Sequence, residues 1–216
     1  MEANFWHDRW TRNELGWHEQ NFNPLLTGNF HRLGVSAGGR IFVPLCGKTR
    51  DIAWLLHGGY RVVGAELSEL AIAQLFDDLG VRPTITDVGK LRLYQAPGLD
   101  IFVGDIFELT APALGKVDAI YDRAALVALP AEMRIRYTRH LMEITHKAPQ
   151  LLICFEYDQS QQPGPPFSVT RDEVRKHYSA DYQVDVVEIK PVPGGLKGKS
   201  PADEVVAILT QASSRN

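Results

Sequence analysis

The chain has 216 residues, of which 44% are hydrophobic and 23% charged, and its formal net charge is -3. This length suits one α/β domain with a single core, and the weak charge gives no reason to expect a nucleic acid or a membrane surface as a partner. The two cysteines, Cys46 and Cys154, form neither a disulfide framework nor a metal-binding pattern and are expected in the core. No run approaches the roughly 18 apolar residues of a membrane span, and two core cysteines fit a reduced compartment, so we expect a cytoplasmic protein. The seven histidines show no ligand spacing, so we expect no metal.

The N-terminal segment is rich in tryptophan. Trp6 and Trp10 are four residues apart within an expected helix over residues 4–14, so both indoles lie on one helical face, and Trp17 follows shortly after. Such rings either fix an N-terminal arm to the core or cover a flat ligand, and the local pattern alone favours the first role. A second amphipathic helix is expected over residues 23–33.

A strand, a glycine turn and a helix follow. Residues 41–45 form a short apolar run that is typical of a buried strand, and Gly47 supplies the turn. Thr49 is the expected N-cap of a helix over residues 51–56. This is the opening unit of a nucleotide-binding α/β sheet, in which the ligand lies beyond the carboxyl end of the strand.

The second strand, expected over residues 60–67, ends with an acidic residue. Glu66 stands 19 residues after Gly47, and Ser68 is the expected N-cap of the following helix over residues 70–79. A carboxylate at the end of the second strand can accept hydrogen bonds from both hydroxyls of a ribose. We therefore expect Glu66 to bind the sugar of a nucleotide-like ligand.

The third strand of the expected parallel sheet covers residues 100–105. Before it, the polar segment 82–97 is interrupted by proline and glycine and is expected as an excursion off the sheet. Asp105 at the strand's end is able to accept a hydrogen bond from the exocyclic amine of an adenine, while Ile106 packs on the ring. On its own this pattern favours the adenine role no more than a structural one.

The fourth strand, over residues 117–121, leads into Arg123, which therefore emerges at the same edge of the sheet. The remaining expected elements are a helix over 130–147, a strand over 151–155, a proline-rich loop over 159–168, a short helix over 172–179, and strands over 183–189 and 205–211. Because no helix separates the last two strands, they indicate an antiparallel hairpin at the end of an otherwise parallel sheet.

This order of elements is typical of class I methyltransferases that use S-adenosylmethionine, with a mostly parallel seven-stranded sheet and helices on both faces. A dehydrogenase needs the pattern G-x-G-x-x-G to bind the pyrophosphate of NAD, and the chain has none. S-adenosylmethionine has no phosphate, so the single glycine of the run PLCGK (residues 44–48) is compatible with it. The contrast favours a methyltransferase.

Four sequence runs, FVPLCGKTRDIAWL, VVGAELSELAI, DRAALVALP and PGPPF, resemble the thiopurine S-methyltransferase family. The resemblance covers nearly the whole chain. It implies one methyltransferase domain over residues 1–216, in which helices within 1–34 cover the active site of a Rossmann-like core over 35–216. It also implies S-adenosylmethionine as cofactor, S-adenosylhomocysteine as product, and a monomer that acts on small molecules.

By position, the resemblance implies that a set of residues contacts S-adenosylmethionine: Trp6, Trp10, Leu45, Glu66, Asp105, Ile106 and Arg123. It implies that Trp17 faces the methyl acceptor and that Arg123 lies where donor and acceptor meet. The implied reaction is an in-line transfer of the methyl group to the thiolate of an aromatic or heterocyclic thiol, mainly by positioning and desolvation. No catalytic base is assigned, because such thiols are more acidic than the thiol of cysteine, whose pKa is about 8.5.

Two other functions stay open. Members of the resembled family are associated with methylating selenium or tellurium compounds and other small nucleophiles, a role in detoxification that keeps the same fold and cofactor. The other alternative is a nucleotide-binding module without catalytic activity. A test for conversion of S-adenosylmethionine to S-adenosylhomocysteine would separate a binding module from an enzyme.

Overall fold

The computed structural model of the chain describes residues 3–16 and 18–212. Its strands are β1 (Arg40–Pro44), β2 (Arg61–Glu66), β3 (Thr84–Val88), β4 (Leu91–Ala96), β5 (Leu99–Val103), β6 (Ala119–Arg123), β7 (Gln150–Tyr157), β8 (Tyr182–Pro191) and β9 (Ala202–Gln211). Its α-helices are α1 (Ala3–Thr11), α2 (Pro24–Asn29), α3 (Asp51–His57), α4 (Glu69–Leu79), α5 (Ala111–Leu114), α6 (Ala131–Ile144) and α7 (Arg171–Tyr178). Short 3-10 helices cover Phe30–Leu33 (η1), Ile106–Glu108 (η2), Leu126–Ala128 (η3) and Gln159–Gln161 (η4).

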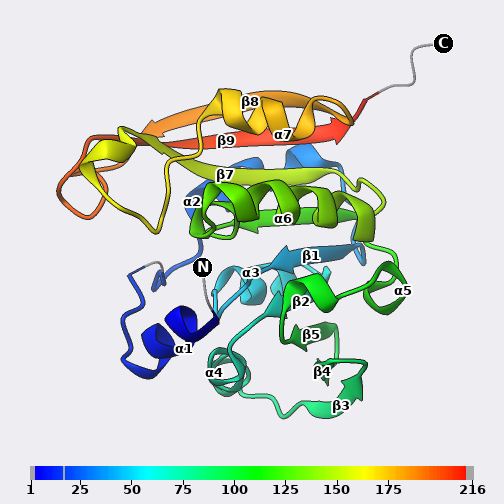
Figure 1. The fold of residues 1–216 in the computed structure, drawn as a ribbon. Helices are drawn as coiled ribbons and strands as arrows, with labels where there is room; N and C mark the ends of the chain where they lie inside the picture. Colours follow the sequence, from blue (N-terminus) through cyan, green and yellow to red (C-terminus); the bar gives the residue numbers. More distant parts are fainter. Residues whose placement is uncertain (1–2, 17, 213–216) are drawn as a thin grey trace.

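The described residues build one mixed sheet with the strand order β3-β4-β5-β2-β1-β6-β7-β9-β8 (Figure 1). The central neighbours β5, β2, β1, β6 and β7 pair in parallel, and β7, β9 and β8 pair antiparallel. This confirms the predicted α/β class with a parallel core and a closing antiparallel hairpin.

The sheet has nine strands, so the expected number of seven is wrong. The extra pair comes from residues 84–96, which form the hairpin β3–β4 and join β5 antiparallel instead of leaving the sheet. Leu91 and Leu93 of β4 pack on one face of the sheet and Tyr94 on the other. Nearly all of β3 is exposed, and backbone pairing holds it at the edge, so no apolar pattern marks it in the sequence.

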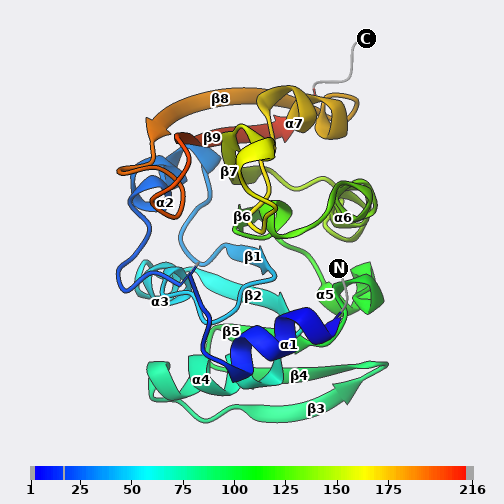
Figure 2. The ribbon, with the colours of Figure 1, turned by 60° about the vertical axis from the view of Figure 1, so that its left-hand side comes forward.

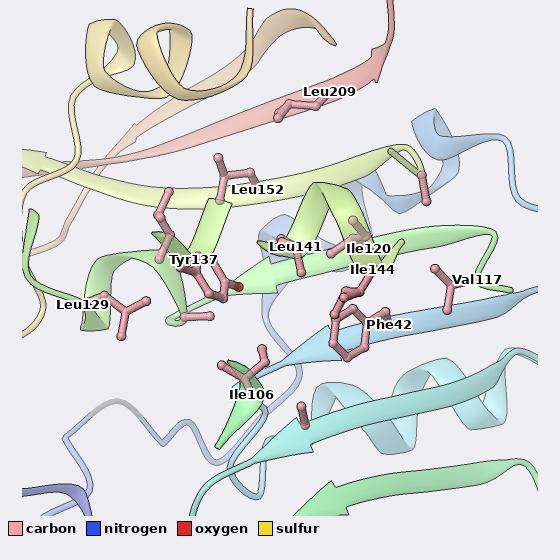
Figure 3. Packing of buried hydrophobic residues seen from close by; sticks show 14 of the residues in the cluster. Phe42, Ile106, Val117, Ile120, Leu129, Tyr137, Leu141, Ile144, Leu152 and Leu209 are labelled. Carbon is pink, nitrogen blue, oxygen red and sulfur yellow. The ribbon is translucent and has the colours of Figure 1, made fainter. Parts of the chain in front are cut away.

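Helices cover both faces of the sheet, and successive residues of β1 face opposite layers. Phe42 packs in one layer with Tyr137 and Leu141 of α6 (Figure 3). This layer also contains side chains of α5 and α7. Ile41 packs in the other layer with Leu55 of α3, together with residues of α2 and α4. The sheet is thus buried on both sides, which explains its continuous apolar strands.

Local signals set most helix ends near their expected places. The Ser68 hydroxyl accepts a hydrogen bond from the N–H of Ala71 at 3.3 Å, and Gly80 ends α4 with φ of +67°. Thr49 is not the N-cap of α3, because Arg50 occupies that place, but the Thr49 hydroxyl still accepts from the N–H of Asp51 at 3.3 Å. The helix therefore starts at the predicted residue with a displaced cap.

One side of the sheet gathers segments that are distant in the sequence. Helix α1 and the loops that follow β7 and precede β9 lie on the same side in Figure 1, and Figure 2 shows α1 running across the strand ends there. Among the described residues, no helix has the length and apolar composition needed to cross a membrane.

Candidate functional site

A cavity of about 460 Å³ lies at the carboxyl ends of the parallel strands, between the sheet and α1. All seven residues that the sequence assigns to the cofactor line it: Trp6, Trp10, Leu45, Glu66, Asp105, Ile106 and Arg123. Trp17, which the resemblance places beside the acceptor, lies outside the described residues. A second hollow, of about 490 Å³, runs along residues 191–203 and contains none of these seven side chains.

Sheet order arranges the predicted residues in a row. Asp105 and Ile106 follow β5, Glu66 ends β2, Leu45 follows β1, and Arg123 ends β6. These four strands are neighbours in that order, and neighbouring strands are about 4.8 Å apart, so the row spans about 14 Å. An elongated ligand therefore fits across the strand ends, with Asp105 at one end and Arg123 at the other.

Glu66 is a buried carboxylate held by the backbone, with 7% of its surface exposed. Its Oε2 accepts from the N–H of Gly47 at 2.8 Å and its Oε1 from the N–H of Ser68 at 2.9 Å. Burial raises the pKa of Glu66, while these backbone hydrogen bonds lower it. Since a carboxylate offers about four lone-pair sites, Glu66 keeps capacity to accept from a hydroxyl of a ribose.

The turn after β1 is pressed against the N-terminal helix. Gly47 has φ of +51°, and a Cβ atom added there would lie 3.1 Å from Cζ2 of Trp10. Trp10 is 4% exposed, whereas Trp6 is partly buried. Trp10 therefore both fixes the arm to the sheet edge and forms a wall of the cavity, so the two roles considered for the tryptophans are compatible in one side chain.

Arg9 is a lining residue that sequence reasoning missed. Its Nε is buried and has no hydrogen-bond partner among the described residues, while its Nη1 lies 3.6 Å from Glu14. Buried guanidinium N–H groups normally have partners, and a carboxylate is the partner that suits them best. The arrangement fits an anionic end of a bound ligand. The only available signal was the place of Arg9 directly before Trp10.

The far end of the row is polar and crowded with charges. Arg123 has 11% of its side chain exposed, and its Nη2 donates a hydrogen bond to Oε1 of Glu19. Lys197, from the loop between β8 and β9, donates to the carbonyl of Pro165 at 2.8 Å. Burial, and then the nearby charge of Arg9, lower the pKa of Lys197. Sequence reasoning missed Glu19 and Lys197, because no local pattern marks a residue that a distant loop brings to the site.

A buried polar network supports this end of the cavity. Asp51 is 1% exposed; its Oδ1 accepts from the N–H of Asn23 at 2.8 Å and its Oδ2 from the hydroxyl of Tyr121 at 2.9 Å. The side-chain amide of Asn23 in turn donates to Glu19 at 3.3 Å. The network therefore links the segment before α2 to α3 and β6, and it fixes the position of Glu19.

The two cysteines are buried thiols, as expected. Cys46 lines the cavity, Cys154 lies in the core, and neither forms a disulfide. Burial raises the pKa of both thiols well above the ordinary value. Both therefore stay protonated, which argues against a role as nucleophile. Within the described part of the chain, no group of acidic, histidine and cysteine side chains is arranged to hold a metal ion.

Comparison with known proteins assigns the chain to a family. The family model for thiopurine S-methyltransferase matches residues 1–202. A thiopurine S-methyltransferase of Xanthobacter autotrophicus is 57% identical, over 98% of this chain and 100% of its own length. Another, of Teredinibacter turnerae, is 51% identical over 98% of each chain.

Solved structures agree at the level of the fold. A methyltransferase of Anabaena variabilis that depends on S-adenosylmethionine has a TM-score of 0.68 at 13% identity, covering 97% of this chain and 95% of that one. The 1,6-didemethyltoxoflavin-N1-methyltransferase of Burkholderia thailandensis, solved with S-adenosylhomocysteine, has a TM-score of 0.66 at 17% identity, covering 97% and 87%. With the family match over nearly its whole length, the chain belongs to the thiopurine S-methyltransferase family and is a methyltransferase that depends on S-adenosylmethionine.

Proposed function

We propose that the protein transfers a methyl group to the sulfur of an aromatic or heterocyclic thiol. The observation that carries this proposal is the row of strand-end residues within one cavity, from Asp105 through Glu66 to Arg123. It offers a sugar-binding carboxylate near the middle and a guanidinium at the end where an acceptor would enter. The names of the bacterial relatives support the sulfur acceptor.

The residues of the cavity suit S-adenosylmethionine, which supplies a sulfonium methyl group when bound. In this proposal Glu66 binds the ribose hydroxyls, Asp105 and Ile106 border the adenine, and the unpartnered Nε of Arg9 faces the carboxylate of the cofactor. Trp10 covers the cofactor from the side of α1. Trp6 and Leu45 complete the wall, as the resemblance implies.

The chain's contribution to the transfer is position, charge and exclusion of water. The guanidinium of Arg123 favours the anionic form of an acceptor sulfur placed beside it. Pro165, Pro166 and Phe155 add apolar surface to the same cavity, and such surface keeps water from a thiolate, whose nucleophilicity water weakens. Holding the sulfur in line with the methyl group supplies the rest of the rate enhancement.

A second acceptor class is favoured by the cations of the cavity. Arg9, Lys197 and Arg123 come from three separate segments and all line it. Cationic side chains suit small oxyanions of selenium or tellurium as well as thiolates. In this second proposal the same cofactor site serves a different nucleophile.

Methyl-transfer assays with 6-mercaptopurine and with selenite separate these proposals. We expect S-adenosylhomocysteine to form with 6-mercaptopurine, and a higher kcat/KM for the thiol than for selenite. Calorimetry with S-adenosylmethionine in the same buffer is the control. Heat of binding without product from either acceptor would contradict both proposed acceptor classes.

A further inference from the structure

We propose that Glu19 accepts a proton from the methyl acceptor, and that the preferred acceptors are heterocycles with a ring N–H directly beside the carbon that bears sulfur. The inference rests on the proposed function, because it concerns the acceptor end of the same cavity. It assigns a role to a residue that the cofactor does not use, and it narrows the class of thiol.

The ion pair between Arg123 and Glu19 places a donor beside an acceptor in the cavity wall. Arg123 alone would attract any anion, but the carboxylate of Glu19 offsets its charge. A thiolate that enters already charged therefore gains less at this pair than a neutral thione whose proton Glu19 takes up. A neutral heterocyclic thione matches both groups, because its sulfur accepts a hydrogen bond from the guanidinium while its N–H donates to the carboxylate.

Glu19 is oriented by buried groups, although 41% of its own side chain is exposed. The amide of Asn23 donates to Oε1 at 3.5 Å and to Oε2 at 3.3 Å. Asn23 itself is 1% exposed: its Oδ1 caps α2, and its N–H donates to Asp51. A carboxylate with about four lone-pair sites can accept these bonds and one more from a ligand.

The proton transfer balances as follows. The N–H bond of the heterocycle breaks, its proton moves to an oxygen of Glu19, and the electron pair stays in the ring. There it forms a C=N bond while C=S becomes a C–S single bond, so negative charge develops on sulfur beside Arg123. A lone pair of this sulfur bonds to the methyl carbon, and the pair of the broken carbon–sulfonium bond goes to the departing thioether sulfur. One proton leaves Glu19 for water in each turnover.

Two isomers test the inference. Pyridine-2-thione carries its N–H beside the C=S group, whereas pyridine-4-thione has the same atoms with the N–H across the ring. For each we would measure kcat/KM for methylation, and the Kd for the enzyme saturated with S-adenosylhomocysteine. The variants are Glu19→Gln, which keeps the shape of the side chain, and the control Asp8→Asn, which removes a charge from an exposed site on α1.

For Glu19→Gln we expect kcat/KM and affinity for the 2-isomer to fall at least about tenfold, the worth of one hydrogen bond to a charged group. For the 4-isomer, kcat/KM and Kd should change less than about twofold. Asp8→Asn should leave kcat/KM and Kd unchanged for both isomers. Equal losses for both isomers, or no loss for the 2-isomer, would overturn the role of Glu19 and leave the proposed function standing. A wild-type enzyme that binds S-adenosylhomocysteine but methylates neither isomer would overturn both.

Discussion

Glu66 shows how a carboxylate can be buried beside a ligand cavity and still be ready for hydrogen bonding. Two backbone N–H groups, of Gly47 and Ser68, hold its oxygens. These hydrogen bonds offset part of the desolvation that raises the pKa of Glu66. One side chain therefore holds two loops in place and also presents a hydrogen-bond acceptor to the cavity. Each N–H comes from a turn that directly follows a strand, which is why the position could be predicted from the sequence.

Replacing Glu66 should weaken binding of the cofactor product. Glu66→Gln loses one charged acceptor toward the ribose, so we expect the Kd for S-adenosylhomocysteine to rise about tenfold to a hundredfold, measured by calorimetry. Glu69→Gln is the matched control, since Glu69 is a carboxylate three residues away that pairs with Arg92 and Tyr94 outside the cavity. If the two variants bind equally well, Glu66 does not hold the sugar.

Asp122 is a buried acid that should make the stability of the protein depend on pH. It is fully buried, and its carboxylate accepts from the hydroxyl of Tyr137 at 2.7 Å and from the N–H of Leu126 at 3.1 Å. Burial raises its pKa from 3.8 to about 6 despite these bonds. The folded protein therefore holds this proton more strongly than the unfolded chain. The contribution of this proton to stability is complete below the pKa that Asp122 has in the unfolded chain. It is lost as pH rises through about 6, the pKa of Asp122 in the folded protein.

Asp122→Asn should remove this dependence. We expect the free energy of unfolding of the wild type, minus that of the variant, to fall by about 2 kcal/mol between about pH 4 and about pH 7. Urea denaturation at both pH values measures the difference, in which the other titrating groups cancel. A difference that stays constant with pH would show that Asp122 titrates normally.

At the scale of elements, the turn after β1 is where backbone conformation and ligand site meet. Gly47 and Gly80 both have positive φ, +51° and +67°, but a Cβ at Gly47 would meet Trp10 whereas one at Gly80 meets open space. Changing either to alanine should cost about 1 kcal/mol of stability through backbone strain. Only Gly47→Ala should also push Trp10 away and weaken S-adenosylhomocysteine binding. Urea denaturation and calorimetry of both variants check this, and equal binding by the two would contradict it.

Elements with local signals were predictable, and those held by distant partners were not. The β1 turn and the cap of α4 followed from Gly47 and Ser68, and Glu66 and Arg123 were found because parallel strands end at one edge. The hairpin β3–β4 escaped prediction because its outer strand buries almost nothing and backbone pairing alone holds it.

The candidate site divides in the same way. The residues along the strand ends could be located from the sequence, while Glu19 and Lys197 could not. Glu19 enters the cavity from the segment before α2 and Lys197 from the β8–β9 loop, and only the folded chain brings Glu19 to Arg123 and Lys197 near Arg9. Sequence patterns describe neighbours along the chain, so side chains that converge from distant loops leave no signature.

At the scale of the whole molecule, α1 forms one wall of the cavity and the sheet edge forms the other. A ligand bound between them should stabilise the docked position of α1. At a S-adenosylhomocysteine concentration of about 100 times Kd, we expect the free energy of unfolding to rise by about 2.7 kcal/mol. Hydrogen exchange of the α1 amides should slow more than that of β1, which is already buried in the core. Exchange in α1 that is the same with and without ligand would contradict its role as a cover.

Among the described residues that line the cavity, Trp6 comes first along the chain and Lys197 comes last. Ribosomes make the first of these residues early and the second only after β8 is complete. A nascent chain halted before the β8–β9 loop would already carry Glu66, to which we assign the ribose, but would lack the part of the cavity wall that Leu196 and Lys197 supply. We therefore expect competence for methyl transfer to be acquired late in synthesis, because a polypeptide truncated before this loop has an incomplete cavity wall.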